Sequence, residues 1–494
     1  SLPIAQAARE ITSRQSGHAP LNILMIVTDQ ERYLGPDDWP IGYRLPGHEK
    51  LMSRGVTFDN HQIGSCVCTP SRAVIYTGQH IQHNGMFDNT NFPWSNDLST
   101  DLPTIGDMMR QQGYYSAYKG KWHLTDEFET ANKLHMPKRL LAEEMEEYGF
   151  SDYFGIGDVI GHTEGGFLHD GVITSMTKSW LRGKGSSLVA ENKPWFMAVN
   201  LVNPHDVMFY NTDLPDQPPM QAETAMMRLN RDPSTKRYRQ QWNPKLPVSR
   251  NQPVTGKDRP GAHENFAVGR SALVGRVPNE DDRWRRLNNY YFNCLQDTDR
   301  HVLEILNELD DLGMSDNTIV IYTADHGELA GAHGMSGKGA TAYREQQHVP
   351  FIITHPAYPG GKHCKAVTSH VDIATTLIGL VGGSASSQDD LPGKDILHCF
   401  VILSRPHLMP FVLALCITTI CLPSWTVISC QKFPDLSETG GNLRRFRRKA
   451  GVPISPNAAL FAACMTGVTN LTVIFLHKSI TRPNQLKHYL QITM

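Results

Sequence analysis

The sequence lacks an excess of charge of either sign. It holds 47 Lys and Arg residues against 49 Asp and Glu residues, so the formal net charge of the 494-residue chain is −2 at pH 7. A chain so close to neutral has no global attraction for nucleic acid or for acidic lipids. We therefore expect no nucleic-acid partner, and any bound anion must be held by a local group of basic side chains.

The chain also lacks a regular cysteine pattern. Its nine cysteines are irregularly spaced, and no Cys-x-x-Cys pair lies near a second one. This pattern excludes the usual signatures of a disulfide framework and of a zinc finger. Cys66 and Cys68 are separated by one residue, and a bridge across so short a span would be strained, which disfavours a redox pair.

No basic segment followed by a long apolar run opens the chain, so no signal peptide is visible. The absence of a visible signal peptide favours a cytoplasmic location. The given chain does not begin with Met, however, which is compatible with a leader that has been removed. A chain of 494 residues can form one large domain with a smaller companion, because single cores rarely grow past about 250 to 300 residues.

Short apolar runs alternate with helical spacing along the first four fifths of the chain. Buried parallel strands have such near-continuous apolar runs. The strand-like runs are 21–28, 56–60, 114–118, 195–202, 318–323 and 349–354, and the helix-like segments are 49–54, 103–112, 282–312 and 371–381. The alternation predicts an α/β fold with a large mixed, mostly parallel sheet sandwiched by helices.

Residues 207–280 interrupt this alternation. They are rich in Pro, Gln, Asn and Arg and show little periodicity. Structureless segments of that length in a compact domain are usually functional or disordered. We therefore predict a long insertion of substrate-facing loops.

The composition changes again after about residue 396. Acidic residues almost vanish and five of the nine cysteines follow, so we predict one domain over residues 1–396 and an atypical region over residues 397–494. Residues 408–428 have about the length of a membrane span, and basic residues at 444–449 follow them. Pro410, Pro423 and the missing periodicity favour the other interpretation, which is out-of-family sequence from an altered reading frame.

Residues that can carry chemistry follow five of the strand-like runs. They are Asp29, the segment around Cys68, Lys121 with His123, His205, and Asp325 with His326, and Lys338 lies a short loop further on. Ligands of open α/β sheets bind at the carboxyl ends of the strands. Each residue alone could be a helix cap, a surface cation or a core histidine. Together they supply a metal site, cations, a nucleophile and proton carriers for attack on a bound oxyanion ester.

The segment around Cys68 reads Cys68-Thr69-Pro70-Ser71-Arg72 and closes on Thr77-Gly78. Proline suits a first helical turn because its missing N–H would have no partner there. The free amides and the positive end of the helix dipole then face an anion. Arg72 lies one helical turn beyond Cys68 and points at the same end.

This pentapeptide resembles the C-x-P-S-R signature of the type I sulfatase family of the alkaline phosphatase superfamily. The cysteine of that signature is oxidised to formylglycine by a separate enzyme. The other matching pieces are Val27-Thr28-Asp29, Gly120-Lys121-Trp122-His123, Asn203-Pro204-His205, Thr323-Ala324-Asp325-His326-Gly327, Gly337-Lys338 and residues 371–376. The resemblance covers roughly residues 20–395 and implies an alkaline phosphatase-like fold, with a sulfatase-like catalytic domain over residues 1–396.

The resemblance implies a metal site. Asp29, Asp325 and His326 would hold a divalent cation together with the modified Cys68. Oxygen-rich ligation suits Ca²⁺. Gln30 is a candidate neighbour of the metal and stands where the family often has a second aspartate. One negative ligand fewer, together with an imidazole ligand, leaves Mn²⁺ or another transition metal open.

The resemblance also implies a nucleophile and the groups that hold the substrate. The aldehyde hydrate formed from Cys68 would attack sulfur while Asp325 accepts its proton. Arg72, Lys121 and Lys338 would neutralise charge on the sulfate oxygens.

Two histidines would carry protons. His205, or alternatively Lys338, would protonate the leaving alcohol or phenol. His123 would remove the proton from the remaining hydroxyl so that the aldehyde re-forms.

These roles predict the hydrolysis of sulfate esters of small molecules or carbohydrates. A formylglycine-generating enzyme is then the expected maturation partner. Two alternatives remain open. One is phosphonate monoester or phosphodiester hydrolysis with the same apparatus, since Gln30 also resembles those members of the superfamily. The other is an inactive binding protein that keeps the fold.

Overall fold

The computed structural model describes residues 20–128, 138–153, 158, 163–339, 341–383, 391–397, 399–400, 426–427, 460–466 and 470–475. The chain divides into two compact units, one of residues 8–403 and one of residues 404–494 with residues 1–7. In the second unit, strands β8 (Thr426–Val427), β9 (Leu460–Thr466) and β10 (Asn470–Phe475) form a sheet in the order β10-β9-β8.

No helix in the described part of the chain is long and apolar enough to cross a bilayer. The predicted span at 408–428 lies outside the described residues apart from Thr426 and Val427. The domain boundary at residue 396 and the altered reading frame stay predictions.

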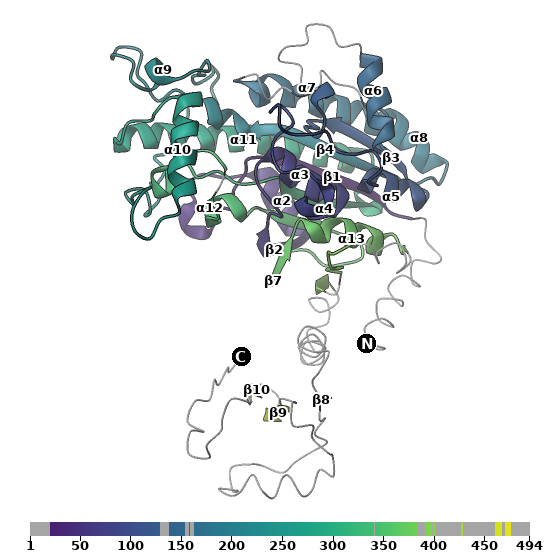
Figure 1. Ribbon diagram of the computed structural model, residues 1–494. Helices are drawn as coiled ribbons and strands as arrows, with labels where there is room; N and C mark the ends of the chain where they lie inside the picture. Colours follow the sequence, from purple (N-terminus) through teal and green to yellow (C-terminus); the bar gives the residue numbers. More distant parts are fainter. Residues whose placement is uncertain are drawn as a thin grey trace, which may run out of the picture. The chain divides into compact units, whose positions relative to one another are not determined.

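A seven-stranded sheet forms the first unit (Figure 1). Its strands are β1 (Asn22–Asp29), β2 (Gly55–Gln62), β3 (Tyr115–Gly120), β4 (Trp195–Pro204), β5 (Thr318–Ala324), β6 (Phe351–Thr354) and β7 (Lys362–Ser369), in the order β3-β4-β1-β5-β6-β2-β7. Strand β6 runs antiparallel to both of its neighbours, and the other adjacent strands are parallel. The predicted mixed, mostly parallel sheet is confirmed.

Helices cover both faces of this sheet. One face packs on α2 (Pro46–Arg54), α7 (Gly165–Trp180), α8 (Ser186–Ala190) and α11 (Asp281–Asp311). The other packs on α3 (Cys68–Thr77), α5 (Ile105–Gln111), α6 (Lys138–Glu147) and α13 (Val371–Leu380). The shorter helices are α4 (Ile81–Asn84), α9 (Gln221–Thr224) and α12 (Arg344–Gln347), and α10 (Gly261–Val274) lies outside both layers of the core.

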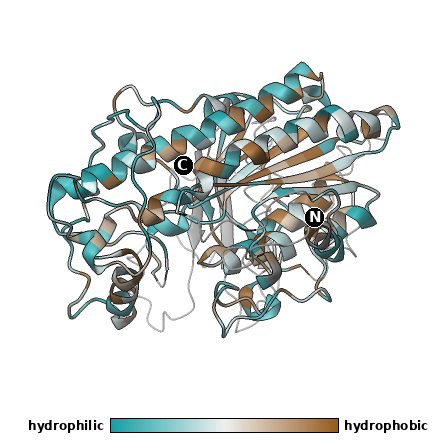
Figure 2. Ribbon diagram, turned by 90° about the horizontal axis from the view of Figure 1, so that it is seen from above, coloured by the Kyte–Doolittle hydropathy of each residue, from teal (hydrophilic) through white to brown (hydrophobic). Residues whose placement is uncertain are grey.

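Strand β1 shows why a continuous apolar run was the right signal for this sheet. All eight of its residues are buried. Ile23, Met25 and Val27 face the layer of α3, α5 and α13, whereas Leu24 and Ile26 face the layer of α7 and α11. Figure 2 shows hydrophobic residues concentrated in the central strands, while the helices alternate between hydrophobic and hydrophilic residues. A strand buried on both faces needs no polar alternation.

The prediction of loops throughout residues 207–280 is wrong in two places, because α9 occupies Gln221–Thr224 and the longer α10 occupies Gly261–Val274. Only two of its residues, His263 and Val274, are buried, and apolar Val268 and Leu273 are exposed. A helix that buries so little has no apolar stripe, which is the signal that identifies helices in a sequence.

The end of β3 depends on a glycine. Gly120 has φ +93°, and a Cβ at this position would lie 1.9 Å from the carbonyl oxygen of Asn200 on β4. Gly113, just before β3, has φ +85° with open space around it. The two glycines therefore share backbone strain, but only Gly120 also has a steric constraint.

We expect Gly120→Ala to destabilise the protein more than Gly113→Ala. The left-handed conformation should cost about 1 kcal/mol in both variants, and displacement of Asn200 should add about 1 to 3 kcal/mol in the first alone. Urea midpoints of the two variants measure the difference. Equal midpoints would show that β3 and β4 separate without cost.

Candidate functional site

The predicted site residues lie at the carboxyl ends of parallel strands. Asp29 is the last residue of β1, and Asp325 directly follows β5. Lys121 follows β3, and His205 follows β4. Strands β3, β4, β1 and β5 are adjacent and parallel, so these ends meet at one edge of the sheet. Helix α3 begins at Cys68 and brings its sulfur to the same edge.

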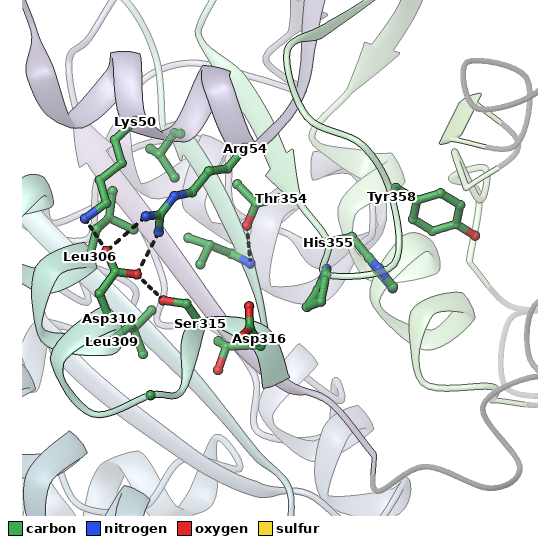
Figure 3. A pocket seen from close by; sticks show the side chains of 15 residues that line it. Lys50, Arg54, Leu306, Leu309, Asp310, Ser315, Asp316, Thr354, His355 and Tyr358 are labelled. Atoms are coloured by element: carbon green, nitrogen blue, oxygen red, sulfur yellow. Dashed lines mark hydrogen bonds and ion pairs between the residues drawn. The ribbon is translucent and has the colours of Figure 1, made fainter.

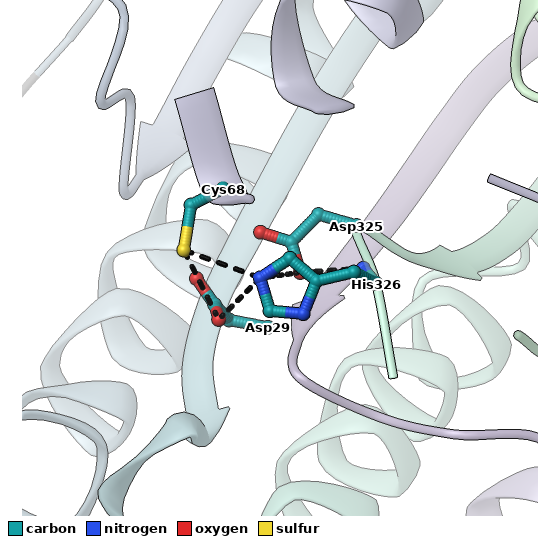
Figure 4. Close-up of side chains that lie close together, drawn as sticks. All are labelled: Asp29, Cys68, Asp325 and His326. Atoms are coloured by element: carbon teal, nitrogen blue, oxygen red, sulfur yellow. Dashed lines mark hydrogen bonds and ion pairs between the residues drawn. The ribbon is translucent and has the colours of Figure 1, made fainter. Parts of the chain in front are cut away.

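Asp29, Cys68, Asp325 and His326 form a buried group whose ligand atoms all lie within 4.8 Å of one another (Figure 4). The sulfur of Cys68 is 3.2 Å from Nε2 of His326 and 3.9 Å from Oδ1 of Asp29. This sulfur occupies the position of the oxygens that an oxidised residue 68 would present. Two carboxylates, an imidazole and those oxygens are a donor set that fits a divalent cation.

The orientation of His326 suits metal binding. Nδ1 of His326 lies 3.0 Å from the carbonyl oxygen of Gly327, which can only accept a hydrogen bond, so Nε2 faces the other ligands. Burial lowers the pKa of His326, but Asp325 and Cys68 outweigh burial and raise it.

Three basic side chains surround the two carboxylates. Arg72 donates from Nε to Oδ2 of Asp325 at 3.0 Å and from Nη2 to Oδ2 of Asp29 at 3.3 Å. Lys121 donates to Oδ2 of Asp29, and Nζ of Lys338 is 3.7 Å from Oδ1 of Asp29. All of these side chains are buried or almost buried. The sequence prediction that these cations converge agrees with this geometry.

The cations change the ionisation of the acidic groups. Burial raises the pKa of Asp29, but Lys121 and Lys338, with smaller contributions from His205 and Arg72, hold it well below its ordinary value. Burial and Asp29 raise the pKa of the Cys68 thiol, whereas Lys121, Lys338 and His326 lower it, and the net pKa is lowered. The site is therefore built to stabilise negative charge.

His123 is held by its backbone rather than by its ring. Its N–H donates to Oδ2 of Asp158 at 2.7 Å, and its carbonyl oxygen accepts a hydrogen bond from the Thr69 hydroxyl at 2.7 Å. Both ring nitrogens are buried and contact no hydrogen-bond partner among the described residues. Burial, followed by Lys121 and Arg72, lowers the pKa of His123 well below its ordinary value. The neutral ring can therefore accept a proton.

His205 begins the short helical segment His205–Phe209 and is 3% exposed. Burial and then Lys338 lower its pKa well below the ordinary value, although Asp29 opposes them. Lys338 is one of the three basic side chains of the site, and Asp29 is one of the proposed metal ligands. Because both influence the pKa of His205, we include His205 in the site.

Gln30 joins two charged groups. Its side-chain oxygen accepts a hydrogen bond from Lys338, and its side-chain nitrogen donates to Glu328. Its backbone N–H donates to Oδ1 of Asp325 at 3.1 Å. The role of Gln30 as a neighbour of the metal stays a prediction.

Sequence analysis missed two residues that hold the site together. Oδ1 of Asn200 accepts hydrogen bonds from Nη1 of Arg72 at 3.1 Å and from the Tyr76 hydroxyl at 2.8 Å. Glu328 accepts hydrogen bonds from Gln30 and from the backbone N–H of Gly337 at 2.6 Å. A signal existed for Asn200, which is the one polar residue in the apolar run 195–202.

A pocket lies near the opposite ends of the strands, away from the group of Asp29, Cys68, Asp325 and His326 (Figure 3). It has a volume of about 460 Å³ and is lined by Lys50, Arg54, Asp310 and Thr318, the first residue of β5. Asp310 lies 2.6 Å from Lys50 and 2.8 Å from Arg54. Lys50, Arg54 and Asp310 are therefore already paired with one another, and we do not assign catalysis to this pocket.

Comparisons with known proteins agree with the geometry. An uncharacterized sulfatase of Escherichia coli, YidJ, is 26% identical over 71% of this chain and 65% of that protein. An N-acetylglucosamine-6-O-sulfatase of Bacteroides thetaiotaomicron is 26% identical over 72% of this chain and 66% of that protein. This chain thus spans slightly less than two thirds of these relatives.

Solved structures share the fold. A 2-O glycosaminoglycan sulfatase matches 77% of this chain and 74% of its own, with a TM-score of 0.57 and 20% identity. A phosphonate monoester hydrolase from Silicibacter pomeroyi matches 78% of this chain and 76% of its own, with a TM-score of 0.55 and 20% identity. The family model described as sulfatase matches residues 22–383. Because that match covers most of the chain, the protein belongs to the sulfatase family.

Proposed function

We propose that this protein hydrolyses sulfate esters, with residue 68 acting after oxidation of its thiol to formylglycine. The observation that carries the proposal is the convergence of Cys68 with Asp29, Asp325 and His326, whose ligand atoms lie within 4.8 Å of one another. Arg72, Lys121 and Lys338 surround the same point with positive charge. Membership of the sulfatase family supports this reading.

Asp29, Asp325 and His326 would hold a divalent cation, and Ca²⁺ is the ion we propose because the ligands are mostly oxygens. When bound, the cation supplies Lewis-acid stabilisation of negative charge on oxygen. The hydrated aldehyde of residue 68 supplies the nucleophilic oxygen. Maturation therefore requires a formylglycine-generating enzyme as partner.

The chain's own basic residues bind the substrate. Lys121 and Lys338 would hold the non-bridging sulfate oxygens, which places the sulfur in front of residue 68. Arg72 contacts both aspartates and keeps its position through Asn200, so its charge supports the whole group. A well-placed donor of this kind contributes about 3 to 4 kcal/mol to the stability of the transition state.

Two histidines carry the protons. His205 would protonate the oxygen of the leaving alcohol, because bound sulfate adds negative charge beside it and raises its pKa from the low value of the free site. His123, whose ring has no hydrogen-bond partner among the described residues, would take the proton from the remaining hydroxyl of residue 68, so that the C–O bond to sulfate breaks, sulfate leaves and the aldehyde re-forms. General acid–base catalysis of this kind accelerates a step about 10² to 10⁴-fold.

Relatives indicate the substrate class. They include an N-acetylglucosamine-6-O-sulfatase and a choline-sulfatase of Rhizobium meliloti. We propose a sulfated carbohydrate or a sulfated small molecule as the substrate. Hydrolysis of phosphonate monoesters is the second candidate, because Gln30 binds Lys338 at the position where the family often has an aspartate. Turnover of 4-nitrophenyl sulfate against 4-nitrophenyl phenylphosphonate separates the two candidates.

The first prediction concerns the nucleophile. Protein produced together with a formylglycine-generating enzyme should show an aldehyde at residue 68 by mass spectrometry and should hydrolyse 4-nitrophenyl sulfate. Cys68→Ala should abolish turnover and leave the unfolding temperature almost unchanged, because the substitution removes one small buried group. Turnover by Cys68→Ala, or an unmodified and inactive thiol in the native host, would contradict the proposal.

The second prediction concerns the metal. Dialysis against a chelator should lower turnover at least about 100-fold, since a Lewis acid contributes several kcal/mol to the transition state. It should also lower the unfolding temperature, because a bound cation stabilises the folded state by mass action. Elemental analysis should find one divalent cation per chain and none in Asp29→Asn. A chelated protein that keeps its activity and its unfolding temperature would exclude the site.

The third prediction concerns the proton donor. His205→Ala should slow hydrolysis of an alkyl sulfate about 10² to 10⁴-fold. Hydrolysis of 4-nitrophenyl sulfate should slow much less, because nitrophenolate leaves without a proton. Lys338→Ala should slow both substrates by the same factor, since its charge acts on the sulfate oxygens. If Lys338→Ala instead slows the alkyl sulfate more than 4-nitrophenyl sulfate, and His205→Ala slows both equally, Lys338 is the proton donor.

A further inference from the structure

Arg270 of α10 contacts the chain segments that carry His205 and Lys338. Its Nη2 donates a hydrogen bond at 2.7 Å to the carbonyl oxygen of Met208, which lies in the helical segment that His205 begins. Its guanidinium also packs on Gly337, where an added Cβ would lie 2.6 Å from Nε. Gly337 immediately precedes Lys338. The Arg270 guanidinium therefore contacts the chain segments next to His205 and Lys338, although α10 belongs to the insertion.

The guanidinium has more donors than the chain satisfies. Nε and Nη1 of Arg270 are buried and have no hydrogen-bond partner among the described residues. Burial lowers the pKa of Arg270 to about 10, although Glu328 opposes this, so the group stays charged at neutral pH. The carboxylate of Glu328 is already bound by Gln30, Gly337 and Ala330. A buried charge with two unsatisfied donors is costly, and an anion from outside the chain would lower that cost.

Arg270 also lines a cavity of about 550 Å³ that carries an excess of positive charge. Its charged lining residues are Arg250, Arg270, Arg276 and Glu264. Arg250 pairs with Asp281, whereas Arg276 forms no side-chain ion pair within the part of the chain that the structure describes. The lining extends to Ser336, two residues before Lys338. The cavity thus extends from the segment just before Lys338 to a lining of arginines that suits an anion.

We propose that Arg270 is the centre of a second anion-binding position, which holds a carboxylate or a second sulfate on the leaving-group part of the substrate. This inference rests on the proposed function and narrows it to sulfate esters that carry another negative charge. The planar guanidinium binds either oxyanion through two parallel hydrogen bonds. Its contact with the residue before Lys338 links this position to the sulfate that Lys338 holds.

Three substrates and three variants test the proposal in aldehyde-bearing protein. The substrates are phenyl sulfate, 3-carboxyphenyl sulfate and 1,3-phenylene bis-sulfate. The variants are Arg270→Met, Arg270→Lys, and Arg239→Met as a matched control, since Arg239 is an exposed arginine of the same insertion. The carboxylate and bis-sulfate arms distinguish the two kinds of anion.

We expect Arg270→Met to lower kcat/KM about 10- to 100-fold for at least one doubly charged substrate, mainly through KM, because a charge-assisted hydrogen bond is lost. Phenyl sulfate should change less than about twofold, because it has no group at this position. Arg270→Lys should recover part of the loss, and Arg239→Met should behave like the unaltered protein. The unfolding temperature of Arg270→Met should not fall, because the substitution removes an unsatisfied buried charge.

Equal losses on all three substrates, or a loss on none, would overturn the proposal. Calorimetric binding of 3-carboxyphenyl sulfate and 1,3-phenylene bis-sulfate to Cys68→Ala and to Cys68→Ala/Arg270→Met separates it from the proposed function. If the double variant binds these compounds more weakly but the aldehyde-bearing protein hydrolyses no sulfate ester, the anion position is kept and the proposed activity is rejected. Equal binding by both proteins would reject the anion position.

Discussion

The structure depends on the burial of opposite charges at one edge of the sheet. Asp29 and Asp325 are fully buried, and so are Arg72 and Lys121, which bind them. Each of these charges would be too costly to bury alone, so the group is stable only when all its members are in place. The basic side chains can hold an incoming anion, whereas the two carboxylates are ligands that a metal ion can use.

A second buried network fixes the strand that carries Asp29. His48 of α2 lies 2.7 Å from Glu31, two residues beyond Asp29, and 2.7 Å from Asp299 of α11. Burial lowers the pKa of His48, but the two carboxylates outweigh it and raise it to about 10. His48 is therefore a buried cation at neutral pH that ties two helices to the end of β1. These charges support the strand that ends in Asp29 without belonging to the group of proposed site residues.

The insertion between β4 and α11 stands apart from this rigid frame. Helix α10 buries little of its own surface, yet it places Arg270 against Met208 and Gly337. In the proposed function the frame would hold the reacting sulfate group, and the insertion would contact the rest of the substrate.

The sequence alone predicted six of the seven strands of the sheet and the residues at their ends, because a strand buried on both faces is a continuous apolar run and the Cys68–Arg72 motif is specific. It did not predict β7, which is mostly exposed and has no such run. Only the tertiary structure decided the partners of those residues. Asn200 binds Arg72 across 128 positions, and Glu328 binds Gln30 across 298. It also decided α10, which has no apolar stripe to reveal it. Contacts between distant segments leave no local pattern, since they arise from how strands are ordered in the sheet.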